Sequence, residues 1–143
     1  MKKLRPERVD FAQVGRFLAG AEKKLIAAKK TIGIDEEASY QLAYEAMLKA
    51  SLGLMLSHGT RPRSLPGHHV VIIEFAGKHL GRESEGLVAL FDRMRRKRNQ
   101  ALYDASGFIS RQEAEQALET AAKYLGMIRK EIQGRNQIGR AHV

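Results

Sequence analysis

Residues 95–104, which read RRKRNQALYD, place four consecutive cations beside an amide and a phenol. An α-helix turns about 100° per residue, so the four cations point in different directions and do not share one solvated face. An apolar stripe with steps of three and four residues runs through Leu87, Phe91, Met94, Arg98 and Leu102. Because an isolated buried charge is costly, we expect Arg98 to be paired, hydrogen-bonded or open to a cleft.

Two interpretations of Arg98 follow from this pattern. Asn99 and Tyr103 are one turn apart and flank the stripe, so they and Arg98 are candidate catalytic residues along one side of a groove. There Arg98 would bind phosphate or transition-state charge, Asn99 would orient the scissile group or hold Arg98, and Tyr103 would contact a base or a phosphate. Alternatively, Arg98 forms a buried salt bridge with Glu45, the only acid in the apolar part of the preceding long helix.

Other basic residues are candidates for nucleic-acid binding. Arg95 and Arg96 belong to the same basic stretch, Arg61 and Arg63 lie in a proline-containing loop, and His69 lies near the start of the next expected helix. Such a surface would bind phosphates, although ordinary solvation explains the loop arginines equally well. The chain has no HExxH motif, P-loop or dinucleotide fingerprint, so we expect no metal site and no cofactor.

The composition is that of a globular protein with a basic bias. The chain has 143 residues and a formal net charge of +9, which favours polyanionic partners such as RNA, DNA, nucleotides or an acidic protein. It has no cysteine, which excludes disulfides and thiolate chemistry and suits a reducing cytoplasm. No stretch has the run of uncharged apolar residues that a membrane span needs, so we expect a cytoplasmic protein without a membrane segment.

Apolar residues spaced by three and four predict helices throughout the chain and no strands. We expect helices near residues 11–32, 36–57, 70–80, 87–103 and from 110 onward, with Asp10, Asp35 and Ser110 as N-caps. The helix at 36–57 is apolar nearly all round, so we expect it at the centre of the fold, with Tyr40 and Tyr44 in the core or a dimer interface. The expected fold class is all-α, an up-and-down bundle of four long helices plus one short helix.

We expect residues 1–137 to form a single helical domain. The last six residues, Ile138–Val143, read IGRAHV. This segment resembles the translation of a common sequencing adapter, and we interpret it as a non-native tail.

These motifs resemble those of the HEPN family of small helical-bundle proteins. Arg98-Asn99 followed by Tyr103 matches the family signature, an Arg with a polar neighbour and then a His or Tyr near the end of the last long core helix. The Tyr- and Ala-rich helix at 36–57 is also similar, as is Gly59 followed by a loop and a His at 68 or 69. The resemblance covers roughly residues 10 to 130.

The resemblance implies an intertwined homodimer whose signature helices meet at a cleft. It also implies a minimal nucleotidyltransferase as the antitoxin partner of a toxin–antitoxin pair. In active members the Arg and His form a metal-independent RNase site. Here Tyr103 stands in the place of that His, and a phenol with an ordinary pKa near 10 is a poor general base at neutral pH.

We therefore expect an RNA- or nucleotide-binding partner of a nucleotidyltransferase. Two alternatives stay open. One is an active RNase that uses Arg98 with Tyr103 or a loop His, and the other is a purely structural interaction module whose groove receives a partner helix.

Overall fold

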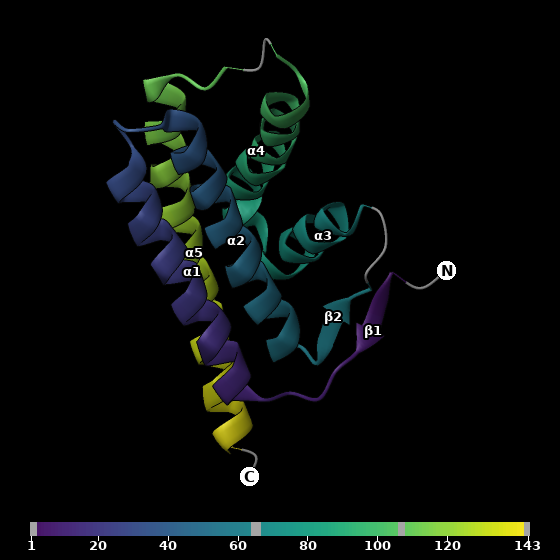
Figure 1. Cartoon of the computed structure of the whole chain (residues 1–143). Helices are drawn as coiled ribbons and strands as arrows, with labels where there is room; N and C mark the ends of the chain where they lie inside the picture. Colours follow the sequence, from purple (N-terminus) through teal and green to yellow (C-terminus); the bar gives the residue numbers. More distant parts are fainter. Residues whose placement is uncertain (1–2, 64–66, 106–107, 142–143) are drawn as a thin grey trace.

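A computed structural model describes residues 3–63, 67–105 and 108–141 of the chain, and its element order is shown in Figure 1. The elements are β1 (Leu4–Pro6), α1 (Phe11–Thr31), α2 (Glu36–Ser57), β2 (Thr60–Pro62), α3 (His68–Leu80), the 3-10 helix η1 (Arg82–Ser84), α4 (Glu85–Tyr103) and α5 (Arg111–Ala141). Helices α1, α2, α4 and α5 are long and α3 is short. The predicted all-α bundle is therefore confirmed.

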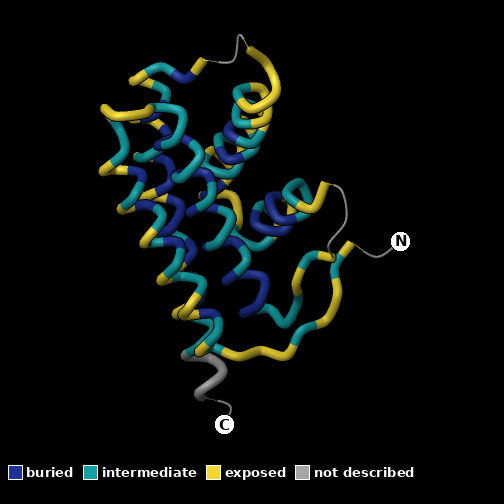
Figure 2. The backbone as a smooth tube through the Cα atoms, viewed as in Figure 1, coloured by how far each residue is buried: buried dark blue, intermediate teal, exposed yellow. Residues whose placement is uncertain are grey.

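Helix α2 is the central helix, as its apolar sequence predicts. It contacts α1 and α5 on one side and α3 and α4 on the other; Figure 1 shows α1, α2 and α5 as long neighbours with α3 and α4 across α2 from α1. Its buried positions follow its whole length, the dark blue segments of Figure 2. At Gly53 an added Cβ would lie 3.5 Å from the Phe17 Cβ, an ordinary van der Waals distance, so α1 and α2 pack directly against each other there.

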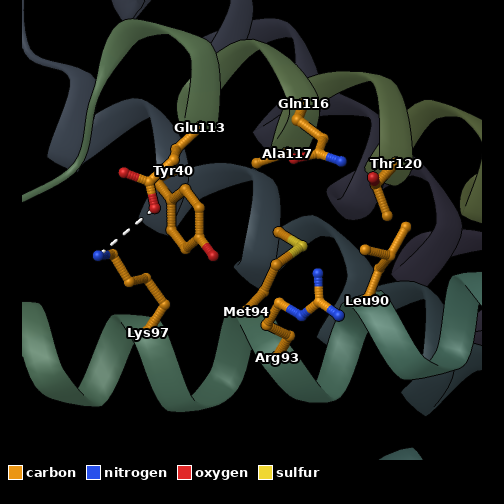
Figure 3. Close-up of a pocket in the computed structure, with 9 residues that line it drawn as sticks. All are labelled: Tyr40, Leu90, Arg93, Met94, Lys97, Glu113, Gln116, Ala117 and Thr120. Carbon is orange, nitrogen blue, oxygen red and sulfur yellow. Dashed lines mark ion pairs between the residues drawn. The ribbon is translucent and has the colours of Figure 1, made fainter.

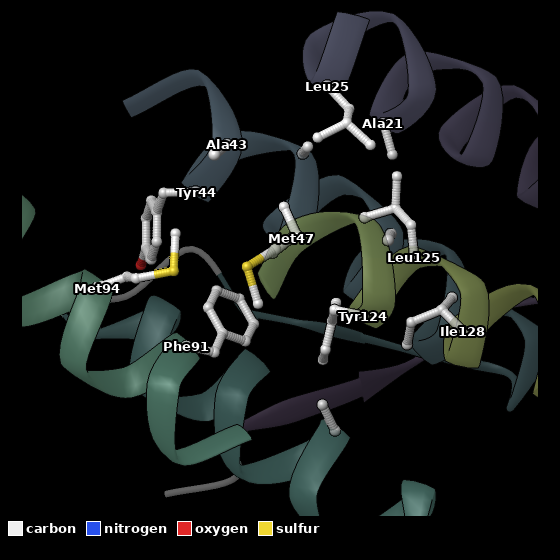
Figure 4. Packing of buried hydrophobic residues seen from close by; sticks show 14 of the residues in the cluster. Ala21, Leu25, Ala43, Tyr44, Met47, Phe91, Met94, Tyr124, Leu125 and Ile128 are labelled. Atoms are coloured by element: carbon white, nitrogen blue, oxygen red, sulfur yellow. The ribbon is translucent and has the colours of Figure 1, made fainter. Parts of the chain in front are cut away.

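Three aromatic rings form the middle of the core where α2, α4 and α5 meet (Figure 4). The Phe91 ring packs edge-on against Tyr44, with centroids 5.5 Å apart, and against Tyr124, with centroids 5.2 Å apart. The fully buried Tyr124 hydroxyl shares a hydrogen bond of 2.5 Å with the Ser51 hydroxyl. A buried phenol needs such a partner, because its hydroxyl has lost water.

The predicted N-caps are confirmed by hydrogen bonds. The Asp10 and Asp35 carboxylates accept from backbone N–H groups in the first turns of α1 and α2. Ser110 and Glu113 form a reciprocal capping box at the start of α5, with distances of 3.0 and 3.1 Å. These caps satisfy N–H groups that a helix start leaves without intrahelical acceptors.

The expectation that the fold contains no strands is wrong in one place. Strands β1 and β2 pair antiparallel, with Arg5 opposite Arg61, and form a short two-stranded ribbon beside the end of α2. Gly59 permits the turn into β2, since its φ of +72° belongs to the left-handed region and a Cβ there would lie 3.3 Å from the Glu7 carbonyl oxygen. The ribbon matters because it positions Arg61 and Arg63.

Candidate functional site

Arg98 lies where the apolar stripe of α4 leaves the core. Met94, one turn earlier, is buried, whereas Leu102, one turn later, is 44% exposed. The Arg98 guanidinium carbon lies 5.5 Å from the centroid of the Tyr44 ring, a cation–π arrangement. The Arg98 Nε is buried and has no hydrogen-bond partner within the described ranges. Since buried donors are nearly always bonded, this donor distinguishes Arg98 from the other cations of the basic stretch and makes it the first candidate for a functional arginine.

The alternative that Arg98 pairs with Glu45 is wrong. The Glu45 carboxylate lies 3.3 Å from the Lys24 ammonium on α1. Glu45 and Tyr44 are neighbours in sequence, but their side chains point about 100° apart around α2. It is therefore Tyr44, not Glu45, that faces α4.

The other three cations of the basic stretch meet carboxylates. Arg95 and Arg96 both lie close to the Asp92 carboxylate, at 3.0 and 3.5 Å. The Lys97 ammonium lies 3.4 Å from Glu113 on α5. Within α4, the charge that the fold leaves facing an aromatic ring is thus the one on the predicted stripe, Arg98.

His69 completes the arrangement from α3. Its Nδ1 and the Tyr44 hydroxyl share a hydrogen bond of 3.0 Å, in which either atom donates according to the histidine tautomer. We call Arg98, Tyr44 and His69 the Arg98 cluster. It joins α4, α2 and α3 around one guanidinium group.

Burial, together with the neighbouring charges, determines the protonation of the Arg98 cluster at neutral pH. Burial raises the pKa of Tyr44 to about 12, although the Arg98 and Arg95 charges oppose this, so the phenol keeps its proton. Burial lowers the pKa of His69 below its usual value, and the neighbouring His68, Arg98 and Arg95 lower it further. His69 is therefore neutral at pH 7 and has one ring nitrogen able to accept a proton.

The structure does not bring Asn99 and Tyr103 into this cluster. Both lie on the last turns of α4, where Asn99 is exposed and the Tyr103 side chain is 86% exposed. Their predicted contacts with a scissile group, base or phosphate stay predictions. The sequence pattern did not identify Tyr44 as the partner of Arg98. The available signal was the position of Tyr44 on α2, one residue before the acid Glu45.

Arg61, Arg63 and His69 are brought together at a groove between the ribbon and α1, α2 and α3. This groove, which we call the ribbon groove, has a volume of about 250 Å³. Its lining residues are Gln13, Phe17, Leu48, Leu52, Leu56, Arg61, Pro62, Arg63, His68, His69 and Ile72. His69 belongs to both the ribbon groove and the Arg98 cluster, so the two sites are adjacent and share one imidazole.

A second hollow lies between α4 and α5 (Figure 3). It has a volume of about 90 Å³, well under the several hundred Å³ of a typical ligand pocket. Its Lys97 and Glu113 pair with each other across it, and Tyr40, whose pKa burial raises to about 12, borders them. We interpret this hollow as packing between two helices.

The described residues contain no group of three or more His, Asp or Glu side chains placed to hold a metal ion. The helices in the same ranges include none with the length and hydrophobicity of a bilayer span. The groups that the structure brings together at the Arg98 cluster are a guanidinium, a phenol and an imidazole.

Comparison with known proteins agrees with the family resemblance. The model of the HEPN domain family matches residues 14–132, which include α1 from Val14 to most of α5. The match contains Arg98, Tyr44 and His69 as well as Asn99 and Tyr103. No match was found among curated proteins.

Proposed function

Because this chain belongs to the HEPN family, we propose that it binds RNA through the Arg98 cluster, as a homodimer. The observation that carries the proposal is the Arg98 guanidinium, whose buried Nε has no partner among the described residues, while its ring neighbour Tyr44 is hydrogen-bonded to His69. A phosphate oxygen would accept from this guanidinium, and charge-assisted hydrogen bonds of that kind are stronger than neutral ones. The formal net charge of +9 favours the same class of ligand.

The support for a homodimer is the exposed surface at the end of α4. Leu102, Tyr103 and Phe108 are 44%, 86% and 71% exposed, so large apolar side chains are open to solvent at the end of α4 and five residues beyond it. A second copy that covers these side chains would bring the C-terminal ends of the two α4 helices together. Asn99 and Tyr103 of both copies would then line a shared cleft. In that setting Asn99 and Tyr103 regain the roles that the sequence predicts for them.

The genetic setting that we propose is a toxin–antitoxin-type module in which a minimal nucleotidyltransferase is the partner. The support is the family membership together with the Arg98-Asn99 and Tyr103 signature. A nucleotidyltransferase encoded beside this chain should co-elute with it in size-exclusion chromatography. A mixture that elutes as two separate proteins at micromolar concentration would argue against this partner.

RNA binding is tested by titrating a fluorescent single-stranded RNA at several salt concentrations. Wild-type protein should bind with a steep salt dependence, because each phosphate contact adds about 0.7 to the slope for single strands. Arg98→Ala should weaken binding and reduce the slope by about that amount. The matched control is Arg82→Ala, which removes one exposed arginine of η1, just before the start of α4 and more than three helical turns from Arg98. Equal losses of RNA affinity in both variants would mean that Arg98 contributes only to the overall positive charge and makes no specific phosphate contact.

A second candidate function, metal-independent RNA cleavage, is favoured by the position of neutral His69 beside Arg98. In that reaction the 2′-hydroxyl oxygen attacks phosphorus and gives its proton to the imidazole. The bond to the 5′-oxygen breaks, that oxygen receives a proton from an acid, and a 2′,3′-cyclic phosphate forms. Arg98 would stabilise the charge that grows on the phosphoryl oxygens.

Cleavage is tested without metal at neutral pH. Activity that is lost in both His69→Gln and Arg98→Ala, and kept in Arg82→Ala, would establish the RNase. Since the pKa of His69 is lowered, the rate should persist below pH 6.5 instead of falling there. RNA binding without cleavage by a dimeric protein would leave the binding function alone. A shallow salt dependence, with Arg98→Ala disturbing assembly instead, would favour the structural interaction module.

A further inference from the structure

The ribbon groove has an apolar floor made by three helices. Leu48, Leu52 and Leu56 recur every four residues and so form one row along α2. Phe17 from α1 and Ile72 from α3 border this row. The floor therefore presents aliphatic surface with one aromatic ring, which suits a flat apolar face of a ligand.

The rim of the ribbon groove is basic. Arg61 and Pro62 come from β2, Arg63 follows directly, and His68 and His69 begin α3. No Asp or Glu occurs among the lining residues that the structure describes. Arg61 lies 3.6 Å from Glu7 and is partly neutralised, whereas Arg63 and His68 are exposed at the rim.

The start of α3 adds to this positive rim. Gly67 occupies the N-cap position and has no side chain to accept from the first N–H groups of the helix. The positive end of the helix dipole thus points toward the region of Arg63 and His68. The His68 and His69 rings, with centroids 4.6 Å apart, supply flat surfaces at the same place.

We propose that the ribbon groove holds one unpaired base of a single-stranded RNA on Phe17 and the leucine row, with Arg63 and His68 on an adjoining phosphate. This inference rests on the proposed RNA binding and narrows its substrate class. A base reaches an apolar floor only when it is neither paired nor stacked in a duplex, so the groove selects single strands. Because His69 borders both sites, a strand seated in the groove continues toward Arg98.

Base insertion is measured with a short single-stranded RNA that carries 2-aminopurine at one internal position. Its fluorescence should change on binding to wild-type protein, and the same RNA annealed to its complement should bind at least about tenfold more weakly. Leu52→Phe fills the floor without changing charge. It should abolish the fluorescence change and weaken binding at least about fivefold, since stacking of one base contributes about 1–3 kcal/mol.

The rim is tested separately. Arg63→Ala should lower the salt slope by about 0.7, while Arg82→Ala, in η1 beyond the far end of α3, should leave the fluorescence change in place. If Leu52→Phe alters the circular dichroism spectrum, His68→Ala replaces it, because that side chain is exposed and its loss leaves the core intact. A loss of the fluorescence change in His68→Ala supports the groove.

The outcomes separate the two proposals. If RNA binds wild type and fails to bind Arg98→Ala, but Leu52→Phe and Arg63→Ala match wild type, the groove proposal is overturned and RNA binding stands. If duplex RNA binds as tightly as the single strand, the groove proposal is likewise overturned. If wild-type protein binds no RNA, the proposed function fails, and the groove proposal fails with it.

Discussion

Replacing Arg98 by methionine separates a functional arginine from a structural one. The guanidinium contributes a cation–π contact with Tyr44, worth about 0.5–2 kcal/mol. Against this, its buried Nε, which has no partner in the part of the chain that the structure describes, costs about 1–3 kcal/mol. Methionine keeps the apolar stem and removes both the cation–π contact and the buried Nε donor. The free energy of unfolding should therefore rise by about 1 kcal/mol or stay unchanged. RNA binding should fall in the same variant.

The measurement is urea denaturation followed by far-UV circular dichroism, because the chain has no tryptophan. A gain of about 1 kcal/mol corresponds to a rise in Tm of roughly 2–4 °C for a chain of this size. Lys97→Met is the comparison variant, since it breaks the partly exposed pair with Glu113 and should lose about 0.2–1 kcal/mol. A loss of about 3–5 kcal/mol in Arg98→Met, as for a broken buried ion pair, would refute the reasoning.

Three further predictions concern the core, the pH dependence and the assembly. Ser51→Ala leaves the buried Tyr124 hydroxyl without its partner and should cost about 1–3 kcal/mol in urea denaturation, whereas Tyr124→Phe should cost less because Ser51 still donates to the Met47 carbonyl. Burial, with the nearby positive charges, lowers the pKa of His58 to about 4, so the unfolded chain binds more protons between pH 6.5 and 4. The free energy of unfolding should therefore fall as the pH drops through that window, by up to about 1.4 kcal/mol per pH unit. In His58→Gln, the free energy of unfolding should fall less steeply over the same window. Leu102→Glu places a charge in the exposed patch at the end of α4 and should raise the Kd of the homodimer at least about tenfold in sedimentation equilibrium; an unchanged Kd would place the interface elsewhere.

The helices could be predicted from the sequence because each long helix carries many turns of a regular apolar pattern. The caps were equally readable, since Asp10, Asp35 and Ser110 stand directly before those patterns. The ribbon could not be predicted, because its strands have three residues each, too few for an alternating pattern to show. Each strand also ends in proline, which argues against a strand, and the two lie more than fifty residues apart in the chain.

In the candidate site too, the features set by helix periodicity could be predicted from the sequence, and those set by tertiary contacts could not. Position 98 is visible in the sequence as a charge on an apolar stripe, because that judgement needs only the helix period. Its partner is not visible, because the rotation of α2 against α4 decides between Tyr44 and Glu45. The contribution of His69 depends further on the path of the chain between α2 and α3, which no local pattern specifies.

The charges of α4 connect assembly with ligand binding. In the described part of the helix, the cations at 95–97 meet carboxylates of Asp92 or Glu113, and Arg98 meets an aromatic ring instead. A dimer formed through the end of α4 would carry two such guanidinium groups toward one cleft, where their repulsion opposes association. A phosphate between them removes that repulsion, so RNA would favour the dimer, and by linkage the dimer must bind RNA more tightly by the same factor. In the proposed assembly, a substitution that weakens the dimer at the exposed apolar side chains therefore also weakens RNA binding, even though it removes no phosphate contact. A purely structural module that binds no RNA would not show this coupling.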